Sequence, residues 1–168
     1  VARYEIGQLI NSARANFRKK FSRRQTALES VHLVIPTPSI STLESHMPQS
    51  SFDYVEARLL QEGKWESAQV RYRGDSSYRW AWDKKSLRIK TRKKSLYGGL
   101  RLINLLAPRS PEQLNNYFSY RLAELMGIPV PKTKLVRLYL NGEDRGVHTL
   151  VEQITEQTLR KDRKSTRL

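Results

Sequence analysis

The sequence predicts an α+β fold in which a mainly antiparallel sheet is braced by one long helix and preceded by a basic amphipathic helix. Three observations support this prediction. Apolar residues recur every three or four positions at the start of the chain, short β-rich runs alternate with glycine turns, and one later segment carries helix-start and helix-stop residues. With 168 residues, of which 38% are hydrophobic, the chain is long enough to form a single core.

Residues 1–30 are predicted to form the basic amphipathic helix. Their apolar positions follow helical spacing, and their charged side chains give a net charge of +5. Such a helix can lie on an anionic membrane surface or follow a membrane anchor, and it can equally pack one stripe on its own domain. The apolar positions are Ile6, Ile10, Ala13, Phe17 and Phe21.

A short strand and a polar connector are expected over residues 31–51. The strand, at residues 31–35, is apolar and ends at Pro36, because proline lacks the backbone donor that a sheet requires. The connector is rich in serine, and a short helix is expected within residues 41–49.

Residues 52–161 are predicted to form the main domain. Strand-like runs at residues 54–59 and 67–72 flank a turn at Gly63, which indicates a hairpin. Residues 85–90 alternate apolar with polar side chains, as a strand with one buried face does. These runs predict the first part of the antiparallel sheet.

The long helix is predicted to begin at Ser110 and to end before Gly127. Ser110 can cap the first turn, Pro111 suits the first helical position, and Gly127 is a typical stop. Its apolar stripe, which we expect to brace the sheet, consists of Leu114, Phe118, Leu122 and Leu125.

Two further strands are predicted after this helix. Residues 134–140 and 146–151 are β-rich and flank Asn141-Gly142. This dipeptide is the strongest short-range signal for a tight hairpin, because both residues tolerate the positive φ of its turn. The sheet is therefore expected to end in a hairpin.

The composition excludes several classes of site. Cysteine is absent, so disulfide frameworks, zinc ribbons and thiol nucleophiles are excluded, and only three scattered histidines remain, so no metal site is predicted. Lys and Arg number 31 against 16 acids, a net charge of +15. The last seven residues, 162–168, read D-R-K-S-T-R-L and resemble a translated sequencing adapter; without them the charge is +13.

The positive charge is concentrated in residues 71–101, which contain eleven basic residues and only two acidic ones. An anionic ligand is therefore expected nearby. The turn after Arg73 contains Gly74, Ser76 and Ser77, which suit either phosphate binding or an ordinary turn. Lys85, on the following strand, suits either a phosphate clamp or a solvated face.

Five motifs in one order carry a resemblance to a known family. They are R-Y-R-G-D-S-S, K-K-S-L-R-I-K, G-I-P-V-P, L-Y-L-N-G-E-D-R-G-V and V-E-Q-I. In order and spacing they resemble the spore-coat protein H (CotH) kinases, over roughly residues 54–161. The resemblance implies the small lobe of a protein-kinase-like fold, which uses ATP and Mg²⁺ to phosphorylate proteins of the cell surface or spore coat.

The resemblance also implies roles for individual residues. Gly74, Ser76 and Ser77 would cover the phosphates, and Lys85 or its neighbour Lys84 would steady them. Glu124, on the long helix, would pair with this lysine, and the segment from Glu152 would form the hinge that binds adenine. The implied nucleotide-binding residues are Arg73, Gly74, Ser76, Ser77, Lys85, Glu152 and Ile154.

Phosphoryl transfer also requires acids that kinases supply from the large lobe after the hinge. Because no such acids are recognisable, the chain is expected to be a truncated small lobe, inactive by itself. The alternative is a basic module that binds nucleic acid, another anionic polymer or the membrane surface; nucleic acid would bind only non-specifically. The expected location is the cell envelope, membrane-associated or extracytoplasmic.

Overall fold

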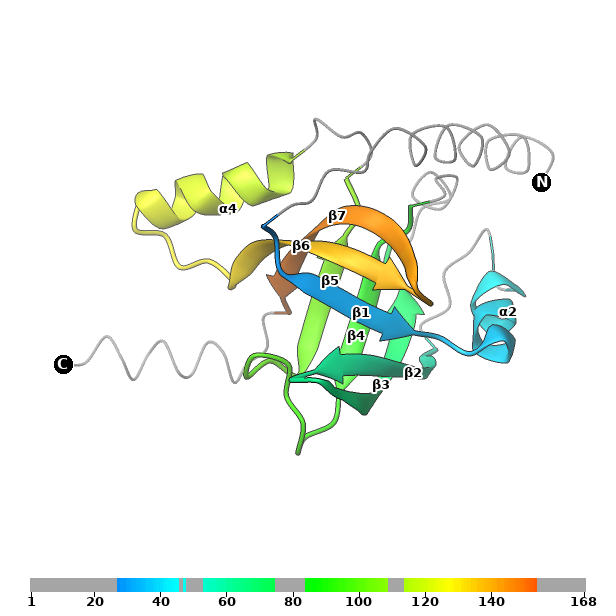
Figure 1. The fold of residues 1–168 in the computed structure, drawn as a ribbon. Helices are drawn as coiled ribbons and strands as arrows, with labels where there is room; N and C mark the ends of the chain where they lie inside the picture. The colour runs from blue at the N-terminus through cyan, green and yellow to red at the C-terminus, as the bar shows by residue number, and fades with distance from the viewer. Residues whose placement is uncertain (1–26, 46, 48–52, 75–83, 109–113, 154–168) are drawn as a thin grey trace.

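The computed structural model describes residues 27–45, 47, 53–74, 84–108 and 114–153. Seven strands within these ranges form a closed barrel in the order β1-β2-β3-β4-β5-β7-β6 (Figure 1). Every neighbouring pair is antiparallel except β1 and β6, which are parallel and close the barrel. The helix predicted near the N-terminus falls on residues 1–26, which lie outside the described residues.

The predicted fold class is wrong. A barrel with its own closed core replaces the open sheet braced by a long helix, and the described residues contain only two helices, both short. The correction has two causes. One strand, β5 (Leu102–Leu106), was not expected. In addition β1 (Ser30–Val34), which was predicted as a short strand outside the main domain, pairs with both β2 and β6 and so belongs to the barrel.

The core fills the interior of the barrel, and strand periodicity explains which residues reach it. In β4 (Leu87–Thr91), residues 87, 89 and 91 are buried while the two between them are half-exposed, as expected when alternate side chains point to opposite faces. The largest fully buried apolar side chains are Leu33, Leu59, Leu87, Ile89, Ile103, Leu105, Leu138 and Leu150. Each strand contributes at least one buried apolar residue.

The predicted Gly63 hairpin is confirmed. It joins β2 (Val55–Gln61) to β3 (Lys64–Tyr72), and it turns through Glu62 and Gly63, both with positive φ. From β4 the chain then extends through a short arm, residues 92–101, before returning as β5. Thr91 anchors the base of this arm, because its backbone N–H and its hydroxyl both donate to the carbonyl of Arg101.

The Asn141-Gly142 hairpin is also confirmed, between β6 (Thr133–Leu140) and β7 (Glu143–Glu152). Asn141 has a φ of 51°, which asparagine tolerates better than most residues. Its side chain accepts a hydrogen bond from the N–H of Ile35 at 2.7 Å and donates to the Ile35 carbonyl at 2.9 Å. The turn therefore also fastens the end of β1.

The two helices lie outside the barrel. The first, α2 (Thr37–Ser45), buries Leu43 and begins four residues before the short helix predicted within residues 41–49. The second, α4 (Asn115–Leu125), buries no side chain, and Leu125 is 81% exposed. The predicted apolar stripe of the long helix therefore does not brace the sheet. Within the described residues, no helix has the length and apolar character to cross a membrane.

Candidate functional site

Two of the predicted phosphate-binding residues lie together at one end of the barrel, where β3 finishes and β4 begins. The backbone N–H of Arg73 donates to the Ser86 carbonyl at 2.9 Å, which continues the ladder between these strands. Gly74 and Lys85 come next on each side, so both lie at this end of the barrel, which we call the opening. Gly74 has a φ of 121°, which L side chains rarely adopt.

Lys84, rather than Lys85, turns inward at this opening. Its ammonium donates to the Val147 carbonyl of β7. A methyl group built on Gly146 would lie 3.5 Å from the same nitrogen, so this glycine passes close to the lysine head. Burial lowers the pKa of Lys84 to about 8, although the negative charge of Asp144 opposes that shift.

Asp144 is the acid that faces this lysine. Burial raises its pKa, but hydrogen bonds from Arg137 and from the backbone N–H of Gly146 outweigh that effect, so the net pKa is lowered. The Gly146 bond measures 2.7 Å, and Arg137 donates from both Nε and Nη2. Asp144 therefore stays ionised at neutral pH, within electrostatic range of Lys84.

His148 is buried in the barrel close to Lys84. It is 0% exposed, and its Nδ1 lies 3.1 Å from the Gly146 carbonyl. Burial lowers the pKa of this imidazole to about 3, and the nearby Lys84 charge lowers it further. The ring is therefore neutral at physiological pH and adds no positive charge to the opening.

Lys85 takes a different environment from its neighbour. Its ammonium lies 5.8 Å from the centre of the Tyr72 ring, in a cation–π contact. It is half-buried beside the opening. The sequence predicted a phosphate-binding lysine at Lys85 or Lys84, and in the structure it is the ammonium of Lys84 that reaches β7.

The predicted hinge begins at the far end of β7. The backbone N–H of Glu152 donates to the Lys132 carbonyl, and that of Gln153 donates to the Leu102 carbonyl at 3.0 Å. Both donors are thus used within the barrel. Five residues of strand, at about 3.3 Å each, separate Val147 from Glu152, so the hinge lies roughly 16 Å from Lys84 along β7.

A polar cluster on the outer face of the barrel positions the side chain of Gln153. Arg88 donates to Asn104 Oδ1 at 2.9 Å and to Gln153 Oε1 at 2.8 Å. The Asn104 amide also donates to Gln153 Oε1, at 3.1 Å. The cluster fixes the chain as it leaves β7, and the sequence contained no local signal for it because its members come from three separate segments.

The remaining predicted site residues are not brought to Lys84. Glu124 pairs with Arg121 on the exposed surface of α4. Ser76, Ser77 and Ile154 lie outside the described residues. Asp144 was not selected from the sequence, although it belongs to the L-Y-L-N-G-E-D-R-G-V motif.

This arrangement suits the phosphates of a nucleotide. A lysine head with reduced hydration attracts an anion more strongly than an exposed one does, and Gly74 leaves the backbone accessible. The fit to a metal is different. Within the described ranges, no group of three or more His, Asp or Glu residues is arranged to hold an ion. No residue is therefore assigned to Mg²⁺.

Comparison with known families agrees with the sequence motifs. The profile of the family described as CotH kinase protein matches residues 70–167, which is more than half of the chain. The match includes the Lys84 opening and all of β4 to β7. It also extends into residues 162–168, the predicted adapter translation. No curated protein matches the chain.

Proposed function

The chain belongs to the CotH kinase family, and we propose that its barrel binds the phosphates of ATP at the opening formed by Arg73, Gly74 and Lys84. Membership of a kinase family implies the use of ATP and Mg²⁺ in general. The observation that carries the finer proposal is the buried ammonium of Lys84, whose pKa is about 8. A partly dehydrated cation is costly to bury unless an anion repays the lost hydration.

In this proposal the phosphates take the place of water at the Lys84 ammonium. Its hydrogen bond to the Val147 carbonyl uses one of three donors, and the others remain for phosphate oxygens. Asp144 keeps the lysine charged by opposing the effect of burial. A bound phosphate would reinforce that effect and raise the pKa of Lys84 again.

Adenine is proposed to lie toward the hinge. Because the N–H groups of Glu152 and Gln153 are already bonded, the contacts would come from carbonyl groups there or from the backbone of Ile154. Arg88, through its bond to Gln153, would position this segment. Transfer itself requires acids that we do not assign to any described residue.

The proposal is tested by measuring ATP binding to the full chain by calorimetry. The Lys84→Ala variant should bind ATP at least about tenfold more weakly, since a charged hydrogen bond contributes roughly 1.5–3 kcal/mol. The control is Lys90→Ala, which removes the same charge from a side chain that instead lies over the Tyr54 ring. Equal losses in the two variants would contradict the assignment.

A second candidate function is favoured by one observation, the net charge of +15. A chain this basic is proposed to bind nucleic acids and anionic membranes non-specifically, in addition to any protein substrate. Such binding should weaken steeply as salt rises, and both lysine variants should reduce it equally. ATP binding that survives 150 mM salt in the original chain and falls selectively in Lys84→Ala would favour the kinase-type site.

A further inference from the structure

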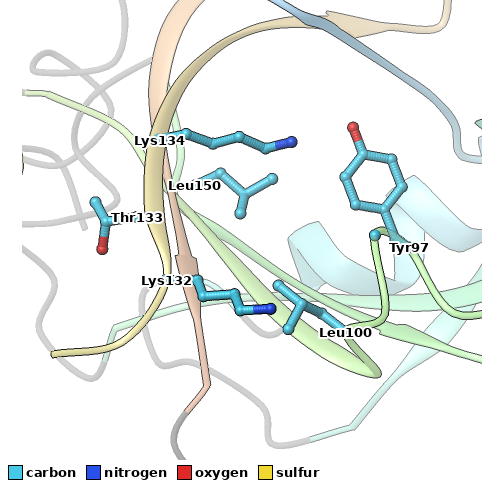
Figure 2. A pocket seen from close by; sticks show the side chains of 7 residues that line it. Tyr97, Leu100, Lys132, Thr133, Lys134 and Leu150 are labelled. Atoms are coloured by element: carbon cyan, nitrogen blue, oxygen red, sulfur yellow. The ribbon is translucent and has the colours of Figure 1, made fainter. Parts of the chain in front are cut away.

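A hollow lies at the opposite end of the barrel from Lys84, beside the start of the proposed hinge, because the backbone N–H of Glu152 donates to the carbonyl of Lys132 in its wall. It has a volume of about 160 Å³. The arm supplies Tyr97, Gly98 and Leu100, and Leu150 of β7 lies between the walls (Figure 2). The start of β6 supplies the other wall, with Lys132, Thr133 and Lys134.

Two hydrogen-bond donors in the lining of this hollow already bind a carboxylate of the same chain. Glu29, just before β1, accepts a hydrogen bond from the Tyr97 hydroxyl at 2.7 Å and another from Lys134. These two bonds lower the pKa of Glu29. Tyr97 and Lys134 therefore form a wall that binds carboxylate oxygens, and an ammonium keeps further donors for a second anion.

Lys132 adds a second positive charge on the same side. In Figure 2 its ammonium lies near Leu100, away from the Tyr97 hydroxyl. Its backbone N–H donates to Oε2 of Glu152 at 3.4 Å, so the carboxylate of Glu152 lies beside this wall. Arg92, Lys93 and Lys94 of the arm are exposed and increase the positive potential.

The walls between these charges are apolar. Leu100 and Leu150 face the space, and the Tyr97 ring forms one side (Figure 2). A ligand that fits must therefore combine a short apolar stem with a terminal anion. A glutamate side chain has this form: its methylene groups can contact the leucines while its carboxylate meets Lys132 and Lys134.

We propose that this hollow, formed by the arm and the start of β6, is a docking site for an acidic side chain of a peptide. Its ligand is recognised by two ammonium groups at the rim and by an apolar floor. A phosphorylated serine shares the terminal anion but lacks the longer stem, so it should bind more weakly. The site lies at the other end of the barrel from Lys84, next to the proposed hinge at Glu152, and its proposal does not depend on phosphate binding at Lys84.

The test follows the methyl resonances of Leu100 and Leu150 by NMR in the full chain at 150 mM salt. Three peptides of five residues are titrated: one with a central glutamate, one with glutamine there, and one with phosphoserine. The glutamate peptide should produce saturable shifts at both leucines. In Lys132→Gln its affinity should fall roughly three- to fivefold, the effect of one exposed charge pair.

Arg58→Gln serves as the matched control, because it removes one exposed charge from β2 on the far side of the barrel. It should leave the affinity unchanged. Equal weakening in both variants, or the same shifts with the glutamine peptide, would overturn the proposal and indicate general electrostatic attraction. Tighter binding of the phosphoserine peptide would overturn the choice of a carboxylate ligand.

Discussion

The two ends of the barrel hold their lysines in contrasting ways. At one end Lys84 is largely removed from water, and it donates to the Val147 carbonyl, with Asp144 acting from nearby. At the other end Lys134 has a side chain 44% exposed and forms an ion pair with Glu29. A cation largely removed from water is a candidate for binding a phosphate directly, whereas a cation already paired with a carboxylate offers a second anion only its remaining donors.

The largest effect is expected from low pH, which should lower the stability of the fold through His148, the buried residue near Lys84. Its folded pKa of about 3 lies below the ordinary 6.5, so the unfolded chain binds a proton that the barrel excludes. The resulting stability is fully present above pH 6.5 and is lost as the pH falls toward 3. The free energy of unfolding should decrease by about 1.4 kcal/mol per pH unit below pH 6.

Chemical denaturation between pH 7 and pH 4.5 checks this prediction. The His148→Gln variant should lose most of the extra pH dependence, since glutamine does not titrate. His32→Gln is the control, because that ring stacks on Tyr139 instead of lying in the core. If His148→Gln keeps the original slope, other groups govern the acid sensitivity.

Replacing each lysine by methionine should sharpen the comparison. Lys84→Met removes a charge that burial disfavours, so at pH 7 the free energy of unfolding should rise by about 1–2 kcal/mol. This gain should shrink between pH 8 and 10.5, where the folded state of the original protein releases the Lys84 proton first.

Lys134→Met should instead lower the free energy of unfolding by less than about 1 kcal/mol, because its ion pair is solvent-exposed. Urea midpoints at constant m-value measure both changes. A destabilised Lys84→Met variant would mean that the bond to the Val147 carbonyl outweighs the loss of hydration.

The smallest effect is expected for Glu29→Gln at the Tyr97 end. Neutral glutamine can still accept from Tyr97 but loses the charge attraction of Lys134, so stability should fall by about 0.5 kcal/mol. The control is Glu56→Gln, an exposed acid on β2. Thermal unfolding at low and high salt should show a salt-dependent loss of stability for Glu29→Gln but not for Glu56→Gln. A loss above about 2 kcal/mol for Glu29→Gln would show that Glu29 contributes more than an exposed ion pair does.

Local sequence signals predicted the two hairpins, but they did not predict that the sheet closes into a barrel. Gly63 and Asn141-Gly142 specify tight turns through φ values that depend on a few neighbouring residues. The pairing of β1 with β6 depends on residues more than a hundred positions apart, which no local pattern encodes. The apolar stripe of α4 correctly predicted a helix, but its spacing contained no information on what it packs against.

The same distinction applies to the candidate site. The order of the motifs brought Gly74 and Lys85 to one end of the barrel, because β3 and β4 follow each other along the chain and pair antiparallel. The choice of Lys84, and the electrostatic influence of Asp144 on it, depend on the position of β7, which lies about sixty residues further along the chain. Glu124 was assigned by analogy with a kinase helix, and the barrel leaves that helix outside.

The parallel pairing of β1 and β6 also determines when this barrel can be completed during synthesis. Asn141 bonds to Ile35 across 106 positions of sequence, so the first strand gains its second neighbour only after almost the whole described chain has left the ribosome. Closure at so long a separation is expected to slow folding. Until then both prospective edges of the sheet are open to pairing with other chains, and a chaperone that covers them would protect the nascent protein from aggregation.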